Sequence, residues 1–203
     1  MTSSKGDHLE TEQKYDAAAD FVLPRLGKSE SKRIYLSATY FDTEDLDLIH
    51  HQITLRRRVG GGDEGWHLKL PVRKDTRQEM HAPLDEGTEG SVPARLAAQV
   101  EDITAGHRLR PIAILDTERT VVTVAARTGD ASVEVADDRV TAIRFGEPDS
   151  EPMIWREIEV EVMSSDSDSE GTALLETVGK TLREAGARPS ASGSKLARVL
   201  GTG

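Results

Sequence analysis

The sequence of 203 residues contains no cysteine, which excludes disulfide bonds and cysteine-ligated zinc or iron–sulfur sites. Aromatic residues are scarce, and no apolar run approaches the roughly 18 residues that a membrane-spanning helix needs. Residues 1–7 are polar and lack the apolar segment of a secretion signal. We therefore expect a cytoplasmic protein whose first seven residues are disordered.

Basic residues are fewer than acidic ones, and the formal net charge of −10 disfavours general binding of nucleic acid. The stretch from Arg56 to Arg77 is the exception, because it holds seven Lys or Arg against three acids. A basic region within an acidic chain indicates a contained site for an anion. We expect a small anionic ligand, no nucleic acid or membrane partner, and a monomer or homodimer.

Alternating hydrophobicity and β-branched residues predict about eight strands, mostly antiparallel. We place them at residues 8–15, 33–40, 52–59, 66–72, 77–84, 112–127, 131–136, 140–145 and 153–163. Helical spacing predicts helices at residues 16–23, 44–51, 92–103 and 173–185. The pattern favours one α+β, mainly β domain over residues 8–200, built as a barrel or strongly curved sheet with helices outside.

The strand at 153–163 carries its charges on one face, because side chains two residues apart point the same way. Glu157, Glu159 and Glu161 share that face, and apolar side chains occupy the other. A sheet with one face in water would explain a single strand of this kind. However, Glu10, Glu12 and Lys14 share a face in another strand, as Arg56 and Arg58 do in a third.

Acid-faced and base-faced strands in one sheet need a reason to coexist, because like charges on neighbouring strands repel. A closed barrel with a polar lumen supplies one. Carboxylates on part of the wall would bind divalent cations, and Arg and Lys elsewhere would bind phosphate oxygens. The charge pattern therefore indicates a ligand that carries several phosphates.

The segment Glu10-Thr-Glu-Gln-Lys14 resembles the ExExK signature of the CYTH superfamily, the triphosphate tunnel metalloenzymes. Further resemblances follow in order along the chain, at residues 40–43, 55–58, 68–70, 77–79, 119, 133–138, 157–161 and 194–198. The repeated acids and the Ser194-Lys195-Leu-Ala-Arg198 tail are most similar to the bacterial inorganic triphosphatase branch.

The resemblance implies an eight-stranded antiparallel β-barrel tunnel with helices packed outside. It also implies a divalent cation, Mg²⁺ or Mn²⁺, bound by Glu10, Glu12, Glu159 and Glu161. The phosphate-binding residues that it implies are Lys14, Arg56, Arg58, Lys69, Arg77, Arg119 and Lys195.

The predicted reaction is hydrolysis of tripolyphosphate to pyrophosphate and phosphate. A second metal, or a carboxylate such as Glu157 or Asp138, would orient or deprotonate the attacking water. Lys14 could act as a base only if its pKa were depressed, and carboxylate neighbours predict the opposite, so we assign it to phosphate binding. The alternatives on this fold are a class IV adenylyl cyclase, a thiamine triphosphatase and a non-enzymatic polyphosphate- or nucleotide-binding module.

Histidines give no recognisable metal motif. His50, His51 and His67 lack a partner at the H-E-x-x-H spacing, so we interpret them as surface or structural residues. The glycines at 60–62 lack the Lys-Ser/Thr of a phosphate-binding loop, which makes a tight hairpin the better interpretation.

Overall fold

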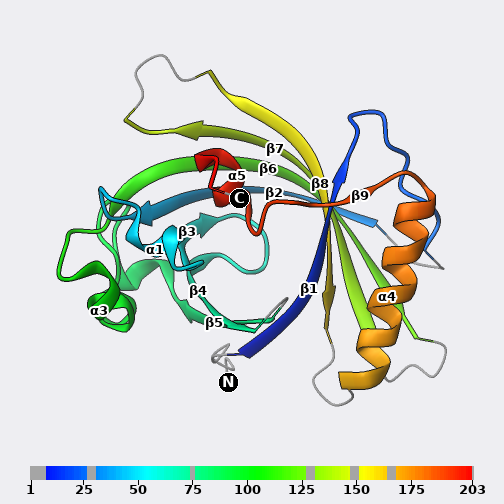
Figure 1. The fold of residues 1–203 in the computed structure, drawn as a ribbon, viewed down its shortest axis with the longest axis horizontal. Helices are drawn as coiled ribbons and strands as arrows, with labels where there is room; N and C mark the ends of the chain where they lie inside the picture. The colour runs from blue at the N-terminus through cyan, green and yellow to red at the C-terminus, as the bar shows by residue number, and fades with distance from the viewer. Residues whose placement is uncertain are drawn as a thin grey trace.

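The computed structural model describes residues 8–26, 31–73, 76–126, 131–146, 151–163 and 168–202. Residues 1–7, which we expected to be disordered, lie outside the described residues. Most of the described chain is strand (Figure 1). The strands are β1 (His8–Ala17), β2 (Ser31–Asp42), β3 (Thr54–Val59), β4 (Gly65–Arg73), β5 (Thr76–Ala82), β6 (Arg110–Ala125), β7 (Ser132–Arg144), β8 (Met153–Val162) and β9 (Arg188–Pro189).

Eight of these strands form a closed antiparallel barrel in the order β5-β4-β3-β2-β6-β7-β8-β1. The barrel closes because β1 pairs with two strands at once. Its first half pairs with β5, so that Glu10 lies opposite Arg77, and its second half pairs with β8, so that Lys14 lies opposite Glu159. The short β9 pairs with β1 beside that junction. The predicted eight-stranded antiparallel barrel is confirmed.

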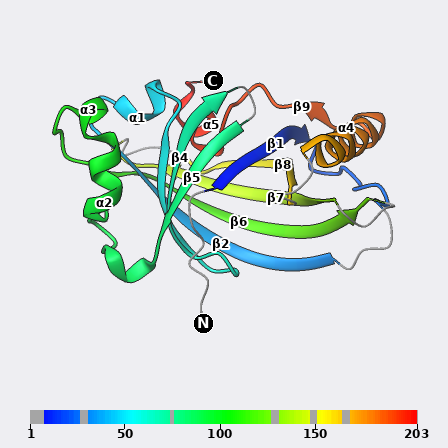
Figure 2. The same ribbon diagram turned by 90° about the horizontal axis from the view of Figure 1, so that it is seen from below.

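The helices lie mainly outside the barrel, at two opposite sides of the molecule (Figures 1 and 2). They are α1 (Asp47–His50), η1 (Leu84–Glu86), α2 (Ala94–Ala97), η2 (Ala98–Val100), α3 (Glu101–Thr104), α4 (Asp168–Glu184) and α5 (Lys195–Leu200). The helices α1 to α3 lie at one side, and α4 lies at the other. Among the described residues, none of these helices combines the length and apolarity needed to cross a membrane.

The predicted helix at residues 16–23 is wrong. Asp16 and Ala17 continue β1 because they pair with Glu157 and Arg156 of β8, and residues 18–26 contain a turn but no helix. Arg156 also donates hydrogen bonds to the carbonyls of Ala19 and Phe21, which holds this segment against the barrel. Strand pairing and these bonds override the local helical preference of an alanine run.

Two further predictions placed the right element with wrong bounds. The strands expected at 131–136 and 140–145 are one strand, β7, since Asp137, Asp138 and Arg139 pair continuously with both neighbours. The helix expected at 92–103 is divided into α2, η2 and α3, and Val100, with φ −122° and ψ 9°, departs from helical geometry at the last boundary.

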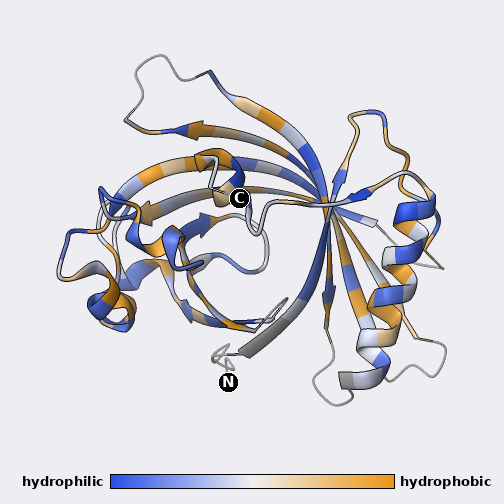
Figure 3. Cartoon of the chain, in the orientation of Figure 1, coloured by the Kyte–Doolittle hydropathy of each residue, from blue (hydrophilic) through white to orange (hydrophobic). Residues whose placement is uncertain are grey.

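The outer face of β8 packs beneath α4, as the alternating pattern predicted. Ile158 and Val160 are fully buried in a cluster with Leu175, Val178 and Leu182 of α4. Figure 3 shows the matching alternation of hydrophobic and hydrophilic residues along the strands. The apolar face is therefore outside the barrel here, which turns the glutamates of β8 toward the lumen.

The last helix, α5, lies on the inner side of the barrel and was not predicted. Leu196 and Leu200 pack in a cluster with Tyr40, Leu115 and Val140. Tyr40 also lines the central cavity, so α5 occupies the same side of the wall as that cavity. The Ser194 hydroxyl caps the helix by accepting a hydrogen bond from the backbone N–H of Ala197.

Gly179 of α4 allows the helix to approach β1 closely. A Cβ built at Gly179 would lie 2.1 Å from the Tyr15 hydroxyl, which is buried and also hydrogen-bonded to Gln13 and Arg183. Gly to Ala in a helix normally stabilises by about 1 kcal/mol, whereas overpacking costs about 1–3 kcal/mol. We predict that Gly179→Ala lowers the free energy of unfolding, measured by urea denaturation.

Gly90→Ala is the control, because Gly90 has no neighbour within 4 Å of its built Cβ. An unchanged or raised stability in Gly179→Ala, with Gly90→Ala also neutral, would contradict the close packing of α4 on β1.

Candidate functional site

A cavity of about 580 Å³ lies inside the barrel and is lined by charges of both signs. Its basic residues are Lys14, Lys32, Arg56, Arg58, Lys69, Arg77, Arg119 and Lys195. Its acidic residues are Glu12, Asp63, Glu79, Glu134, Glu159 and Glu161. The cations outnumber the acids by two among these described side chains, so the lining favours an anion inside a protein that is acidic as a whole.

The strand register brings the acids together. Glu161 of β8 lies opposite Glu12 on one side and Glu134 on the other. Four residues along the strand, Glu157 lies between Asp16 and Asp138. Like charges directly opposite each other destabilise a sheet, so these rows of carboxylates require cations among them.

Lys14 is the first of these cations. Its ammonium lies 3.1 Å from Oε1 of Glu12 and 2.9 Å from Oε1 of Glu159. Burial alone would lower the pKa of Lys14, but the two carboxylates outweigh it and raise the pKa above the ordinary value. The predicted direction of that shift is confirmed, and Lys14 is a poor proton acceptor in this environment.

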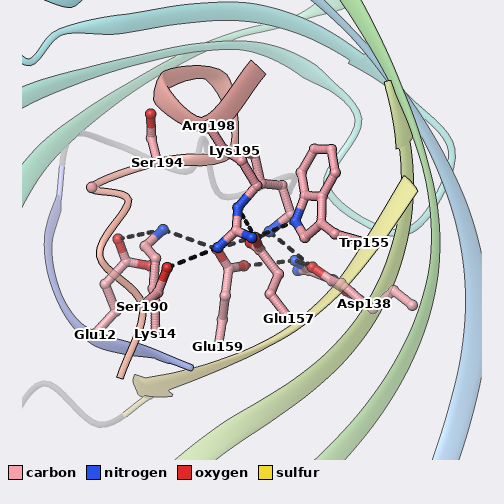
Figure 4. Close-up of polar contacts among 12 residues, drawn as sticks. Glu12, Lys14, Asp138, Trp155, Glu157, Glu159, Ser190, Ser194, Lys195 and Arg198 are labelled. Atoms are coloured by element: carbon pink, nitrogen blue, oxygen red, sulfur yellow. Dashed lines mark hydrogen bonds and ion pairs between the residues drawn. The ribbon is translucent and has the colours of Figure 1, made fainter. Parts of the chain in front are cut away.

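Lys195 is the second cation, and it lies at the centre of three carboxylates (Figure 4). Its ammonium is 2.9 Å from Asp138, 2.6 Å from Glu157 and 2.9 Å from Glu159. Burial opposes the charge of Lys195, but these carboxylates hold its pKa well above the ordinary value. In return, Lys14 and Lys195 overcome the burial of Glu159 and hold its pKa well below the ordinary value.

Residues around the start of α5 fix the position of this ammonium. The Trp155 indole donates to Glu157 Oε2 at 2.6 Å, and Arg198 lies over the Trp155 ring with its guanidinium carbon 5.5 Å from the ring centroid. Arg198 also donates to Asp16. It donates as well to the Ser190 hydroxyl (Figure 4). These contacts tie α5 to β1 and β8 and thereby hold Lys195 in the acidic cluster.

Arginines provide the opposite wall. Arg119 makes a bidentate pair with Asp138, at 2.7 Å for each bond, and reaches Glu159 at 2.8 Å. Arg56 donates to the Tyr40 hydroxyl at 3.4 Å, and its buried Nε has no hydrogen-bond acceptor among the described residues. A buried guanidinium with spare donors is suited to an anionic ligand.

Arg58 is bound by the hairpin that joins β3 and β4. Its guanidinium donates to the Asp63 carbonyl at 3.1 and 2.9 Å and also to the Asp63 carboxylate. Burial and the neighbouring Arg56 lower the pKa of Arg58 to about 10, and Asp63 counteracts them. The antiparallel pairing of β3 with β4 across residues 60–64 confirms the predicted hairpin, and the glycines at 60 and 61 both have positive φ.

Most of the residues predicted for the site line this cavity. They are Glu12, Lys14, Arg56, Arg58, Lys69, Arg77, Arg119, Glu159, Glu161 and Lys195. The backbone of Glu10 belongs to β1, but its side chain lies outside the described part of the structure. Asp138 and Glu157 are buried on the inner face, behind the lining, where they bind Lys195.

Several lining residues had no assigned role. Glu79 lies 4.0 Å from Lys69 and 2.8 Å from His67, and Glu134 continues the row of Glu12 and Glu161. Their parity along β5 and β7 was a usable signal. Asp63 had no such signal, because its position depends on how the β3–β4 turn folds back.

The donor set fits a divalent cation of the magnesium class. Asp138, Glu157 and Glu159 present carboxylate oxygens within 4.8 Å of one another. Glu12 and Glu161 are paired across β1 and β8 on the same inner face. All of these donors are oxygens, which Mg²⁺ and Mn²⁺ prefer. A cation could be held here by carboxylates that currently share Lys14 and Lys195.

The model of the CYTH domain family matches residues 8–198. The chain belongs to the CYTH domain family. The matched range includes all eight barrel strands and the first four residues of α5. Two curated Mycobacterium tuberculosis proteins, the uncharacterized Rv2226 and MT2285, are each 41% identical to this CYTH chain over 211 residues. The match covers 96% of this chain and 40% of each relative, so the chain spans less than half of their length.

Solved structures share the CYTH fold at low sequence identity. A candidate adenylate cyclase of Bacillus halodurans has a TM-score of 0.57 at 18% identity, covering 95% of this chain and 98% of its own. A candidate adenylyl cyclase of Hippeastrum, HpAC1, has a TM-score of 0.53 at 14% identity, covering 95% of both chains. The structure of HpAC1 is described as revealing a dominant triphosphatase activity.

Lys195 neutralises the carboxylates of Asp138, Glu157 and Glu159, so its removal should lower the stability of the folded protein. We expect Lys195→Met to lower the free energy of unfolding by about 3–5 kcal/mol at pH 7, since unpaired buried charges remain. The pKa values of Asp138 and Glu159 are lowered in the folded protein, so their stabilisation is present above their unfolded pKa and lost as pH falls. The deficit of the variant should therefore shrink as the pH falls below about 4, measured by urea denaturation across pH.

Lys180→Met is the matched control, because Lys180 is exposed on α4. An equal and pH-independent effect of the two substitutions would contradict the role assigned to Lys195.

Proposed function

We propose that this CYTH domain hydrolyses a triphosphate with the help of a divalent cation, and that inorganic tripolyphosphate is its substrate. The observation that carries this proposal is the composition of one cavity, where eight basic and six acidic side chains face the same space. Tripolyphosphate with bound Mg²⁺ complements both halves, because the phosphates pair with the bases and the metal pairs with the acids.

The phosphate chain would lie along the basic wall. The Nε of Arg56 on β3 can donate a hydrogen bond to a phosphate oxygen. Lys69 on β4, Arg77 on β5 and Arg119 on β6 also line the cavity. Arg119 is paired with Asp138 and Glu159. An incoming phosphate would share these donors with the acids and offset the repulsion among its own oxygens.

The metal would be held by Glu12, Glu159 and Glu161, together with Glu10 if its side chain follows the parity of the strand. When bound, such a cation neutralises charge on the phosphate oxygens and acidifies a coordinated water. Lys14 would remain charged and donate to a phosphate oxygen, because its pKa is raised by Glu12 and Glu159 in spite of burial.

Asp138 and Glu157 take a positioning role in this proposal. Each is bound to Lys195 behind the cavity lining, so their carboxylates orient that ammonium toward the ligand. Contact between either carboxylate and the attacking water would require displacement of Lys195.

One feature favours a triphosphate that carries an organic group as the second candidate. Ile34, Leu36, Val121, Val162 and Met163 also line the cavity. An apolar stretch of wall could contact a base or another organic moiety, which tripolyphosphate lacks. ATP and thiamine triphosphate are therefore the substrates to compare.

The proposal predicts that phosphate release from tripolyphosphate with Mg²⁺ or Mn²⁺ falls at least about 100-fold in Glu10→Ala/Glu12→Ala. The measurement is release of phosphate from tripolyphosphate, longer polyphosphates, ATP and thiamine triphosphate, with cyclic AMP assayed from ATP. The control is Glu101→Ala/Asp102→Ala, which removes the same charge from exposed positions on α3. Equal activity in the two double variants, or cyclic AMP as the main product, would refute the proposal.

A further inference from the structure

Two histidines and an aspartate meet where the β3–β4 hairpin faces β5. His67 of β4 lies directly opposite His81 of β5, and their rings are edge-to-face with centroids 5.0 Å apart. Asp63 belongs to the hairpin turn between β3 and β4. One possible ligand atom from each of Asp63, His67 and His81 lies within 4.8 Å of the other two.

The hydrogen bonds of His67 leave one ring nitrogen in an unfavourable place. Nδ1 lies 2.8 Å from Oε1 of Glu79, and Nε2 lies 3.1 Å from the carbonyl oxygen of Asp63. Both neighbours are acceptors when Glu79 is ionised, but a neutral imidazole has only one N–H. If Nδ1 donates to Glu79, Nε2 keeps its lone pair, which is the lone pair that a metal ion would take.

The contact with Glu79 resembles the contact that usually orients a metal-binding histidine. A ligating histidine typically donates its second ring N–H to a carboxylate or a carbonyl, which fixes the ring and its tautomer. His67 is only 1% exposed, so its ring is held by this packing as well. No pattern in the sequence pairs His67 with His81, because only the register of β4 on β5 brings the two residues together.

The chain leaves room for His81 at this point. A Cβ built at Gly65 would lie 2.4 Å from Nε2 of His81, and Gly65 has a φ of +148° that other residues rarely adopt. Nε2 of His81 is 3.2 Å from the Glu64 carbonyl. Glycine at 65 therefore allows the second imidazole to lie under the hairpin.

Asp63 offers a carboxylate that is partly exposed. Its side chain is 35% exposed and binds Arg58 through Oδ2. A ligating carboxylate is commonly hydrogen-bonded to a second group in this way. Asp63 also lines the cavity, so an ion bound here would adjoin the wall that carries Arg58.

We propose that Asp63, His67 and His81 form a binding site for a zinc-class divalent cation, separate from the carboxylate cluster around Lys195. Two imidazole nitrogens and one carboxylate favour Zn²⁺ over Mg²⁺ or Mn²⁺, which prefer oxygen donors. Three protein ligands leave a fourth position for water. The ion would fasten the β3–β4 hairpin to β5 and fix Asp63 beside Arg58.

The test is titration of EDTA-treated, dialysed full chain with Zn²⁺ by calorimetry, in excess Mg²⁺ to occupy the carboxylate cluster. Wild type and Glu10→Ala/Glu12→Ala should each bind one Zn²⁺ per chain with the same affinity. His81→Gln and Asp63→Asn should bind at least about tenfold more weakly, as loss of a ligand implies. His50→Gln is the control, because His50 is exposed on α1.

Co²⁺ provides a second readout that a merely structural change would not imitate. Its visible absorption should show nitrogen-ligated Co²⁺ in wild type and in His50→Gln, and the bands should be lost or shifted in His81→Gln. Thermal denaturation without metal verifies that each variant is folded. Absence of Zn²⁺ binding in wild type, or equal affinity in wild type and folded His81→Gln, would overturn the proposal.

Discussion

Repulsion among buried carboxylates is the constraint on which the rest of this structure depends. Strands β1, β8 and β7 place glutamates and aspartates opposite one another on the inner face of the barrel. Such rows are tolerated only with cations between them. Lys14, Lys195 and Arg119 supply these cations, and each contacts two or more acidic groups.

The position of α5 follows from this constraint. Its first residue, Lys195, must reach the three carboxylates, and Arg198 one turn later ties the helix to Asp16 and Trp155. The apolar residues Leu196 and Leu200 fill the inner side of the barrel beside Tyr40. Charge neutralisation and burial of apolar surface thus hold the same short helix in place.

Barrel closure makes the charged lumen a single site. Because β1 pairs with both β8 and β5, the acidic strands adjoin the strands that carry Lys69 and Arg77. An open sheet would leave these two groups at opposite edges. The same closure removes exposed strand edges, so the fold and the site have a common cause.

The faces of the strands could be predicted from the sequence, because a period of two needs no knowledge of the partners. Glu159 and Glu161 line the cavity and Ile158 is buried beneath α4, as their alternation indicated. The strand register and the position of α5 could not be predicted. The register decides that His67 meets His81, and the position of α5 decides that Lys195 meets Glu157.

Local propensity misled where tertiary contacts were stronger. The alanines after Asp16 favour a helix, but pairing with β8 extends β1 to Ala17. The six residues of α5 were too short for helical periodicity to be recognised, and their helix depends on the Ser194 cap and on packing inside the barrel.

The central claim is that the acids and bases of the lumen bind one metal–triphosphate complex. The most direct measurement is anomalous diffraction at the manganese edge from crystals grown with Mn²⁺ and a methylene-bridged, non-hydrolysable tripolyphosphate. We predict a manganese peak in the cavity at the carboxylates of Glu12, Glu159 or Glu161, with phosphates at Arg56 and Arg119. An empty cavity, with manganese or the analogue bound only on the outer surface, would contradict the account.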